Sequence, residues 1–192
     1  MKTNKTNRNF RTARRVTNAH PMDRVINTVR RTVDYAVVNP GTFVPGTGSF
    51  AFYEKMSSIC TTGLEHFDDM ASARPLLEIL RQFARTGHPE PCCLYGSYLN
   101  KEDKPWFSPV EAATMLDAAV RGIEADPANP LAPHILCIYG VSLLEDRPGR
   151  PRDAVRAREY VVRAAEGGSS QARRFLPLLD AMEAERKKEN EA

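Results

Sequence analysis

Apolar residues recur every three or four positions along most of this chain, the spacing that places them on one face of a helix. A clear example follows Pro21, a residue type that favours the first helical turn; its apolar positions are Val25, Ile26, Val29, Val33 and Val37. Stretches rich in Pro and Gly interrupt the pattern at 39–48, 126–130 and 146–153. No run of alternating β-branched residues predicts a strand. The pattern therefore predicts an all-α fold with short connections.

Start and stop signals divide this pattern into about eight helices. The expected helices begin at Pro21, at a cap on Ser49 and at Pro75, then cover 92–99, 109–125 and 132–145, followed by one that ends at Gly167-Gly168 and one from Ser170 onward. Residues 1–19 have only Phe10 and Val16 as sizeable apolar groups, too few to form a core. We expect an extended or disordered arm over 1–19 and a single helical domain over 20–192.

A pattern of large and small residues recurs within these helices. From Ala157 it places large residues at Tyr160 and Val161 and small ones at Ala164 and Ala165; it recurs from Ala112 and from Leu76. The phrases LYGSYL (94–99) and IYGVSL (138–143) also correspond, each with a Gly that lets two helices approach closely. Helix pairs repeated at such intervals are typical of a short α-solenoid of stacked antiparallel pairs.

The clearest copy, residues 134–172, resembles the Sel-one-like repeat, a relative of the tetratricopeptide repeat; 91–128 is a weaker match. The residues that carry the resemblance are Tyr139-Gly140, Asp153, Ala157, Tyr160-Val161, Arg163-Ala164-Ala165 and Gly168. The loop 146–153 is longer than that family's. The resemblance implies a scaffold or adaptor for protein–protein interaction, within a larger assembly, and it implies no catalytic residue.

The net charge of +3 conceals an asymmetry, because residues 1–33 hold nine Lys or Arg and a single acid, Asp23. The rest of the chain is mildly acidic. Six of these bases lie in the arm: Lys2, Lys5, Arg8, Arg11, Arg14 and Arg15. Three interpretations stay open for the arm: an idle solvated tail, a tail that binds RNA through phosphate contacts, and a mitochondrial targeting segment.

Other candidate chemistry is sparse. Glu65, His66, Asp68 and Asp69 are of the types that a hydrolase or metal site uses, but neighbouring residues on a helix point in different directions. The cysteines form no CxxC pair, so we expect reduced, mostly buried thiols at Cys60, Cys92, Cys93 and Cys137. The sequence predicts no cofactor, no metal site and no membrane-inserted segment.

Aromatic residues near the 100–108 loop are the candidates for partner binding. Trp106, the only Trp, and Phe107 either tuck under their own hairpin or anchor a partner, as Tyr98 could. We predict a non-enzymatic helical-repeat scaffold that binds a protein partner. The alternative is an RNA-binding component of a ribonucleoprotein, for example a mitochondrial ribosome, that uses the basic arm. The expected location is intracellular, in the mitochondrial matrix or the cytoplasm.

Overall fold

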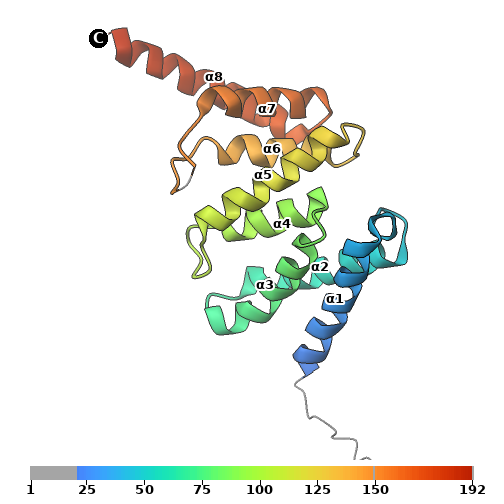
Figure 1. Ribbon diagram of the computed structural model, residues 1–192. Helices are drawn as coiled ribbons and strands as arrows, with labels where there is room; N and C mark the ends of the chain where they lie inside the picture. Colours follow the sequence, from blue (N-terminus) through green and yellow to red (C-terminus); the bar gives the residue numbers. More distant parts are fainter. Residues whose placement is uncertain (1–20, 149, 192) are drawn as a thin grey trace, which may run out of the picture.

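A computed structural model describes residues 21–148 and 150–191, and these residues form an all-α fold, as predicted. They contain no strand, only an isolated bridge between Arg147 and Arg150. The helices follow chain order from α1 at one end of the molecule to α8 at the other (Figure 1). They are α1 (Pro21–Val38), α2 (Gly48–His66), α3 (Met70–Ala84), α4 (Pro89–Leu99), α5 (Pro109–Ala125), α6 (Ala132–Ser142), α7 (Ala154–Glu166) and α8 (Ser170–Glu191), with a 3-10 turn η1 (Pro40–Thr42).

Three helix starts differ from the prediction. Helix α4 begins at Pro89 rather than at residue 92, and α2 and α3 begin where side-chain caps lie elsewhere. The N-cap of α2 is Thr47, whose Oγ1 accepts a hydrogen bond from the backbone N–H of Phe50 at 3.3 Å. The N-cap of α3 is Asp69, whose Oδ1 accepts one from the N–H of Ser72 at 2.9 Å. A cap of this kind satisfies an N–H that the first turn leaves unpaired. Helix α3 therefore begins before Pro75, which lies inside it.

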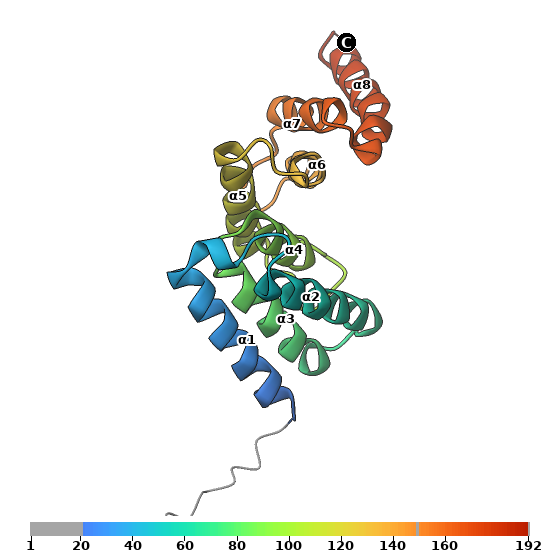
Figure 2. The same cartoon turned by 90° about the vertical axis from the view of Figure 1, so that its right-hand side faces the viewer.

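Helices that are adjacent in the chain form the main contacts. The pairs α2–α3, α4–α5 and α6–α7 each pack together, α1 lies against α3, and α8 lies against α7. In Figure 2, α2, α4 and α6 follow one another up the same side of the molecule. The first helices of the three pairs therefore share a face.

Glycine sets the approach of the two helices within a pair. A Cβ built on Gly96 of α4 would lie 3.1 Å from the carbonyl oxygen of Ala112 in α5. One built on Gly140 of α6 would lie 2.9 Å from the carbonyl oxygen of Ala157 in α7. The predicted close approach at both glycines is confirmed, and the partner is the second helix of the same pair.

A second contact recurs in the same two pairs. A Cβ on Gly122, near the end of α5, would lie 2.5 Å from Cγ of Pro89 at the start of α4. A Cβ on Gly167, directly after α7, would lie 2.8 Å from Cγ of Pro133 at the start of α6. Each pair is thus closed at one end by a proline ring that sits on a glycine. The two pairs share their packing chemistry at both positions.

The core runs continuously through the stack of helices. The small and large residues of the pattern in α7 are all buried: Ala157, Tyr160, Val161, Ala164 and Ala165. At the other end an aromatic cluster joins η1, α2 and α3: Phe43, Phe50, Tyr53 and Phe83, with ring centroids 5.1 to 6.2 Å apart. The four cysteines are free and buried, as predicted.

Candidate interaction groove

A groove of about 490 Å³ runs along the shared face of α2, α4 and α6. We call it the α2–α4–α6 groove. Its lining residues are Tyr53, Ser57, Ser58 and Thr61 of α2; Glu90, Cys93, Leu94 and Ser97 of α4; and Leu131, His134, Ile135 and Ile138 of α6 and its N-cap. On each helix these residues fall on successive turns, with one adjacent pair in the middle, so each helix contributes one continuous face.

Three of the five hydroxyl groups that line the groove already donate their proton to a backbone carbonyl. Ser57 Oγ donates a hydrogen bond to the carbonyl oxygen of Glu54 at 3.0 Å, and Thr61 Oγ1 donates one to that of Ser58 at 3.0 Å. Ser97 Oγ donates to the carbonyl oxygen of Cys93 at 2.7 Å. A hydroxyl has a single proton to donate, so these three groups remain available only as acceptors.

Two buried polar atoms of the groove lack a hydrogen-bond partner of good geometry. They are Oη of Tyr53, whose side chain is 1% exposed, and Oε2 of Glu90. The two groups lie near enough to affect each other's ionisation. Burial, followed by the charge of Glu90, raises the pKa of Tyr53. Burial, followed by the nearby carboxylate of Glu54, raises the pKa of Glu90.

The groove continues toward the last helix. A smaller hollow of about 190 Å³ shares Ser97 and Ile138 with it and adds Asn100, Glu145 and Gln171 among its lining residues. Gln171 lies in the first turn of α8. The lining residues of the two hollows include the carboxylates of Glu90 and Glu145 and no Lys or Arg, but Glu145 is paired with Arg147 at 2.7 Å, so Glu90 is the carboxylate without a basic partner. This surface is therefore rich in hydrogen-bond acceptors and negative in formal charge.

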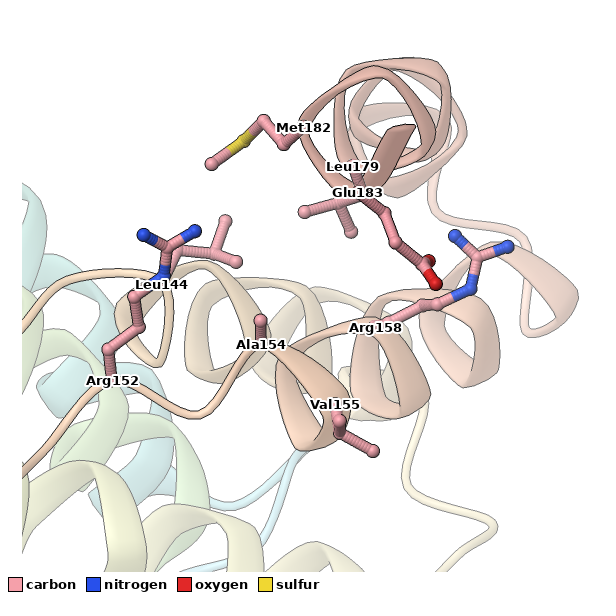
Figure 3. A pocket seen from close by; sticks show the side chains of 8 residues that line it. All are labelled: Leu144, Arg152, Ala154, Val155, Arg158, Leu179, Met182 and Glu183. Atoms are coloured by element: carbon pink, nitrogen blue, oxygen red, sulfur yellow. The ribbon is translucent and has the colours of Figure 1, made fainter. Parts of the chain in front are cut away.

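A separate hollow of about 240 Å³ lies between α7 and α8 (Figure 3). Leu179 and Met182 of α8 face Leu144 and Ala154 across it, while Val155 points away. Arg158 at its edge forms an ion pair with Asp180. The hollow thus combines apolar side chains with the charged residues Arg152, Arg158 and Glu183.

The three predicted partner-binding aromatics are mostly enclosed by their own hairpin. Trp106 is 4% exposed, and its Nε1 donates a hydrogen bond to the carbonyl oxygen of Tyr98 at 3.1 Å. Tyr98 is 7% exposed, and Phe107 is partly buried with the guanidinium of Arg147 over its ring at 5.1 Å. The structure therefore has Trp106 tucked under the hairpin rather than exposed, and Tyr98 and Trp106 do not present a surface to a partner.

The acidic and histidine side chains at 65–69 serve separate structural roles. His66 Nδ1 lies 2.7 Å from the carbonyl oxygen of Thr62, Asp68 pairs with Lys104 at 2.5 Å, and Asp69 caps α3. Within the described parts of the chain, no three His, Cys, Asp or Glu side chains are grouped so that they could hold a metal ion. The structure does not gather these residues into a site.

Lys2, Lys5, Arg8, Arg11, Arg14 and Arg15, the predicted nucleic-acid contacts, lie outside the described residues. No motif in the sequence predicted the groove itself. Its only signal was the placement of hydroxyl residues at helical spacing, Ser57 and Thr61 in one helix and Ser97 in another. These hydroxyl residues form one surface only in the folded chain, where three helices that are tens of residues apart in the sequence lie side by side.

Comparison with family models, curated proteins and solved structures finds no match for the chain. The resemblance to the Sel-one-like and tetratricopeptide repeats therefore depends on the residues quoted for it. Among the helices of the described residues, none combines the length and the apolar character needed to cross a membrane.

Proposed function

We propose that this protein is a short α-solenoid of the Sel-one-like or tetratricopeptide-like kind, and that it serves as a non-catalytic scaffold within a larger assembly. The recurrence of the same contacts in two successive pairs supports the repeat. Gly96 packs on α5 as Gly140 packs on α7, and Pro89 meets Gly122 as Pro133 meets Gly167. Repeats that contact mainly their neighbours build extended concave surfaces suited to binding.

The observation that carries the proposed function is the α2–α4–α6 groove. Three first helices each contribute one face to it, and it combines apolar side chains with acceptor groups. Such a mixture is typical of a site that binds a peptide segment. The apolar parts of the peptide's side chains need apolar contacts, and its polar groups need hydrogen-bond partners. We propose that a protein partner binds there.

A pair of matched substitutions tests this function. Ser97→Trp places a bulky side chain in the groove, at a residue that lines both hollows. Thr114→Trp is the control: Thr114 is exposed on α5, outside the groove, and like Ser97 it donates its hydroxyl proton to the carbonyl four residues earlier. Partners captured by the wild-type chain from its source cells, identified by mass spectrometry, should be lost with Ser97→Trp and kept with Thr114→Trp. Equal capture of the same partners by both variants would show that the partner does not bind in the groove.

A second candidate function is RNA binding through the arm. It is favoured by the concentration of positive charge in residues 1–33, where nine Lys or Arg accompany one acid. Phosphate contacts of this kind give affinity without sequence specificity. The two functions use different parts of the chain, so each can be tested by itself.

A further inference from the structure

We propose that the α2–α4–α6 groove binds a Lys or Arg side chain carried on an extended segment of a partner protein. The inference rests on the proposed function and specifies the chemistry of its partner. It starts from the hydrogen-bonding capacity of the lining, which the sequence of any one helix does not reveal.

Three of the five hydroxyl groups in the lining can act only as acceptors. The hydroxyls of Ser57, Thr61 and Ser97 have each donated their proton to a carbonyl of their own helix. What they present to the groove is lone pairs, which require a donor. An ammonium supplies three N–H donors and a guanidinium five, and neither brings an acceptor that would compete.

The charge of the groove favours the same ligand. Oε2 of Glu90 is buried, and among the described residues the hydroxyl of Tyr53 is the one nearby group that can donate to it, in a geometry too poor for a full hydrogen bond. The exposed carboxylate of Glu54, which does not line the groove, adds a second negative charge near Glu90. A buried carboxylate gains most from a cation that also donates hydrogen bonds. A phosphate backbone would meet acceptors and like charge here, so the groove is unsuited to RNA.

The apolar part of the lining suits the stem of a long basic side chain. Leu94 lies on α4, and Ile135 and Ile138 lie on α6 along the groove. Lys and Arg bury their methylene groups against such surfaces while the charged head reaches a polar partner. Leu94 and Ile138 are only partly buried, so a ligand stem would cover them, whereas Ile135 already belongs to the core.

Direct titration with peptides tests the inference. The probe is a short fluorescein-labelled peptide in which Lys alternates with Ala. Two matched peptides replace each Lys by norleucine, which keeps the stem without the charge, or by Glu. Fluorescence anisotropy with the full chain should show the Lys peptide binding at least about tenfold more tightly than either control, the range of a charged hydrogen bond. Equal affinity for the Lys and norleucine peptides would overturn the inference.

Variants locate the binding. Glu90→Gln keeps the shape of the side chain and removes its charge, so it should weaken Lys-peptide binding about tenfold. Glu54→Lys, at an exposed position that tolerates change, should weaken it similarly by placing a cation beside Glu90. Glu159→Gln, an exposed carboxylate on α7 that lines neither hollow, is the control and should leave binding unchanged. If all three variants bind alike, the peptide does not use this groove and the inference is wrong.

One competing occupant is the chain's own arm. A full-length variant with Gln at all six basic positions, which we call the arm variant (Lys2, Lys5, Arg8, Arg11, Arg14 and Arg15 changed), separates the two cases. Similar peptide affinity for the native chain and the arm variant supports a partner segment. Binding that appears only in the arm variant would assign the groove to the arm and overturn the inference.

The outcomes of these experiments distinguish a failure of this inference from a failure of the proposed function. If Ser97→Trp abolishes partner capture while Glu90→Gln does not, and the norleucine peptide binds as well as the Lys peptide, the groove binds a partner of other chemistry. If Ser97→Trp leaves partner capture intact, the proposal that a protein partner binds in the groove is wrong.

Discussion

Arg150 reaches from the loop between α6 and α7 to Asp117 of α5, with its Nη2 2.5 Å from Oδ1 of that carboxylate. The same guanidinium donates to Ser142 Oγ at 2.9 Å and to the carbonyl oxygen of Ala113 at 2.7 Å. It lies 5.0 Å from the ring of Tyr139, whose hydroxyl also donates to Asp117. One side chain thus fixes a proline-rich loop to the preceding helix pair.

Arg150→Met should destabilise the protein by about 1–3 kcal/mol, because it removes the donor to the buried Ser142 hydroxyl and to the half-buried acceptors of Ala113 and Asp117. Arg150 is 8% exposed, so water cannot replace it without rearrangement of the loop. Urea unfolding followed by circular dichroism measures the loss. Arg150→Lys keeps the charge but cannot form the fork of hydrogen bonds, and we expect only partial recovery. Full stability in the Met variant would contradict this role of the loop.

Gly140→Ala should cost about 1–3 kcal/mol, since the added methyl would lie 2.8 Å from Cγ2 of Val161 and 2.9 Å from the carbonyl oxygen of Ala157. Gly96→Ala should cost less, because its nearest contacts are 3.0 to 3.1 Å. Gly48→Ala, which meets nothing within 4 Å, is the control and should change stability by less than about 1 kcal/mol. Thermal melts of the three variants test this order of stability losses. Equal melting temperatures for all three would show that the helices of a pair are not closely packed at Gly96 and Gly140.

Trp106 should report the folding of the α4–α5 hairpin. It is the only Trp in the chain, it is buried, and its indole N–H is hydrogen-bonded to Tyr98. We expect blue-shifted emission with little quenching by acrylamide in the native state, and a red shift on unfolding. Trp106→Phe removes the hydrogen bond and should cost about 0.5–1.5 kcal/mol. Strong quenching in the native protein would show that the indole is open to solvent.

The buried thiols should react slowly. Burial raises the pKa of Cys60 to about 12 and that of Cys92 to about 11, so few thiolates exist near neutral pH. Ellman's reagent at pH 8 should label the native protein far more slowly than the protein in urea. Because these pKa values are raised on folding, their contribution to stability is complete below the unfolded value of about 8.5 and declines as pH rises above it. Rapid native labelling would contradict the burial.

The arm variant tests RNA binding. If all six basic residues contact phosphates, neutralising them should flatten the plot of log affinity against log salt by about 4–5, at roughly 0.7–0.9 per contact. Titration of labelled single-stranded RNA at several salt concentrations gives both slopes. The body should keep its melting temperature, since residues 1–19 contain little apolar surface. Equal slopes for the native chain and the arm variant would contradict RNA binding by the arm. The arm would then be either an idle solvated tail or a mitochondrial targeting segment.

Much of the fold follows from local signals. Periodic apolar residues placed the helices, and Gly96 and Gly140 indicated where helices meet. The start of α3 was missed because Pro75 seemed a stronger signal than the cap at Asp69. Arg150 was missed because its role depends on Asp117, in a different helix pair. The groove combines residues from three helices, and the hydrogen bonds that turn its hydroxyls into acceptors are visible only in three dimensions.

The recurrence of the proline–glycine contact at Pro89–Gly122 and Pro133–Gly167 has a consequence for the length of the molecule. The contact lies within each pair, so an inserted copy of residues 89–132 would carry its own proline and glycine and close its own pair. We expect such an insertion to fold as an additional module and to lengthen the groove by one helix. Duplication of the gene segment for one helix pair could therefore lengthen the binding surface by one helix at a time, without changes to the core of the existing pairs.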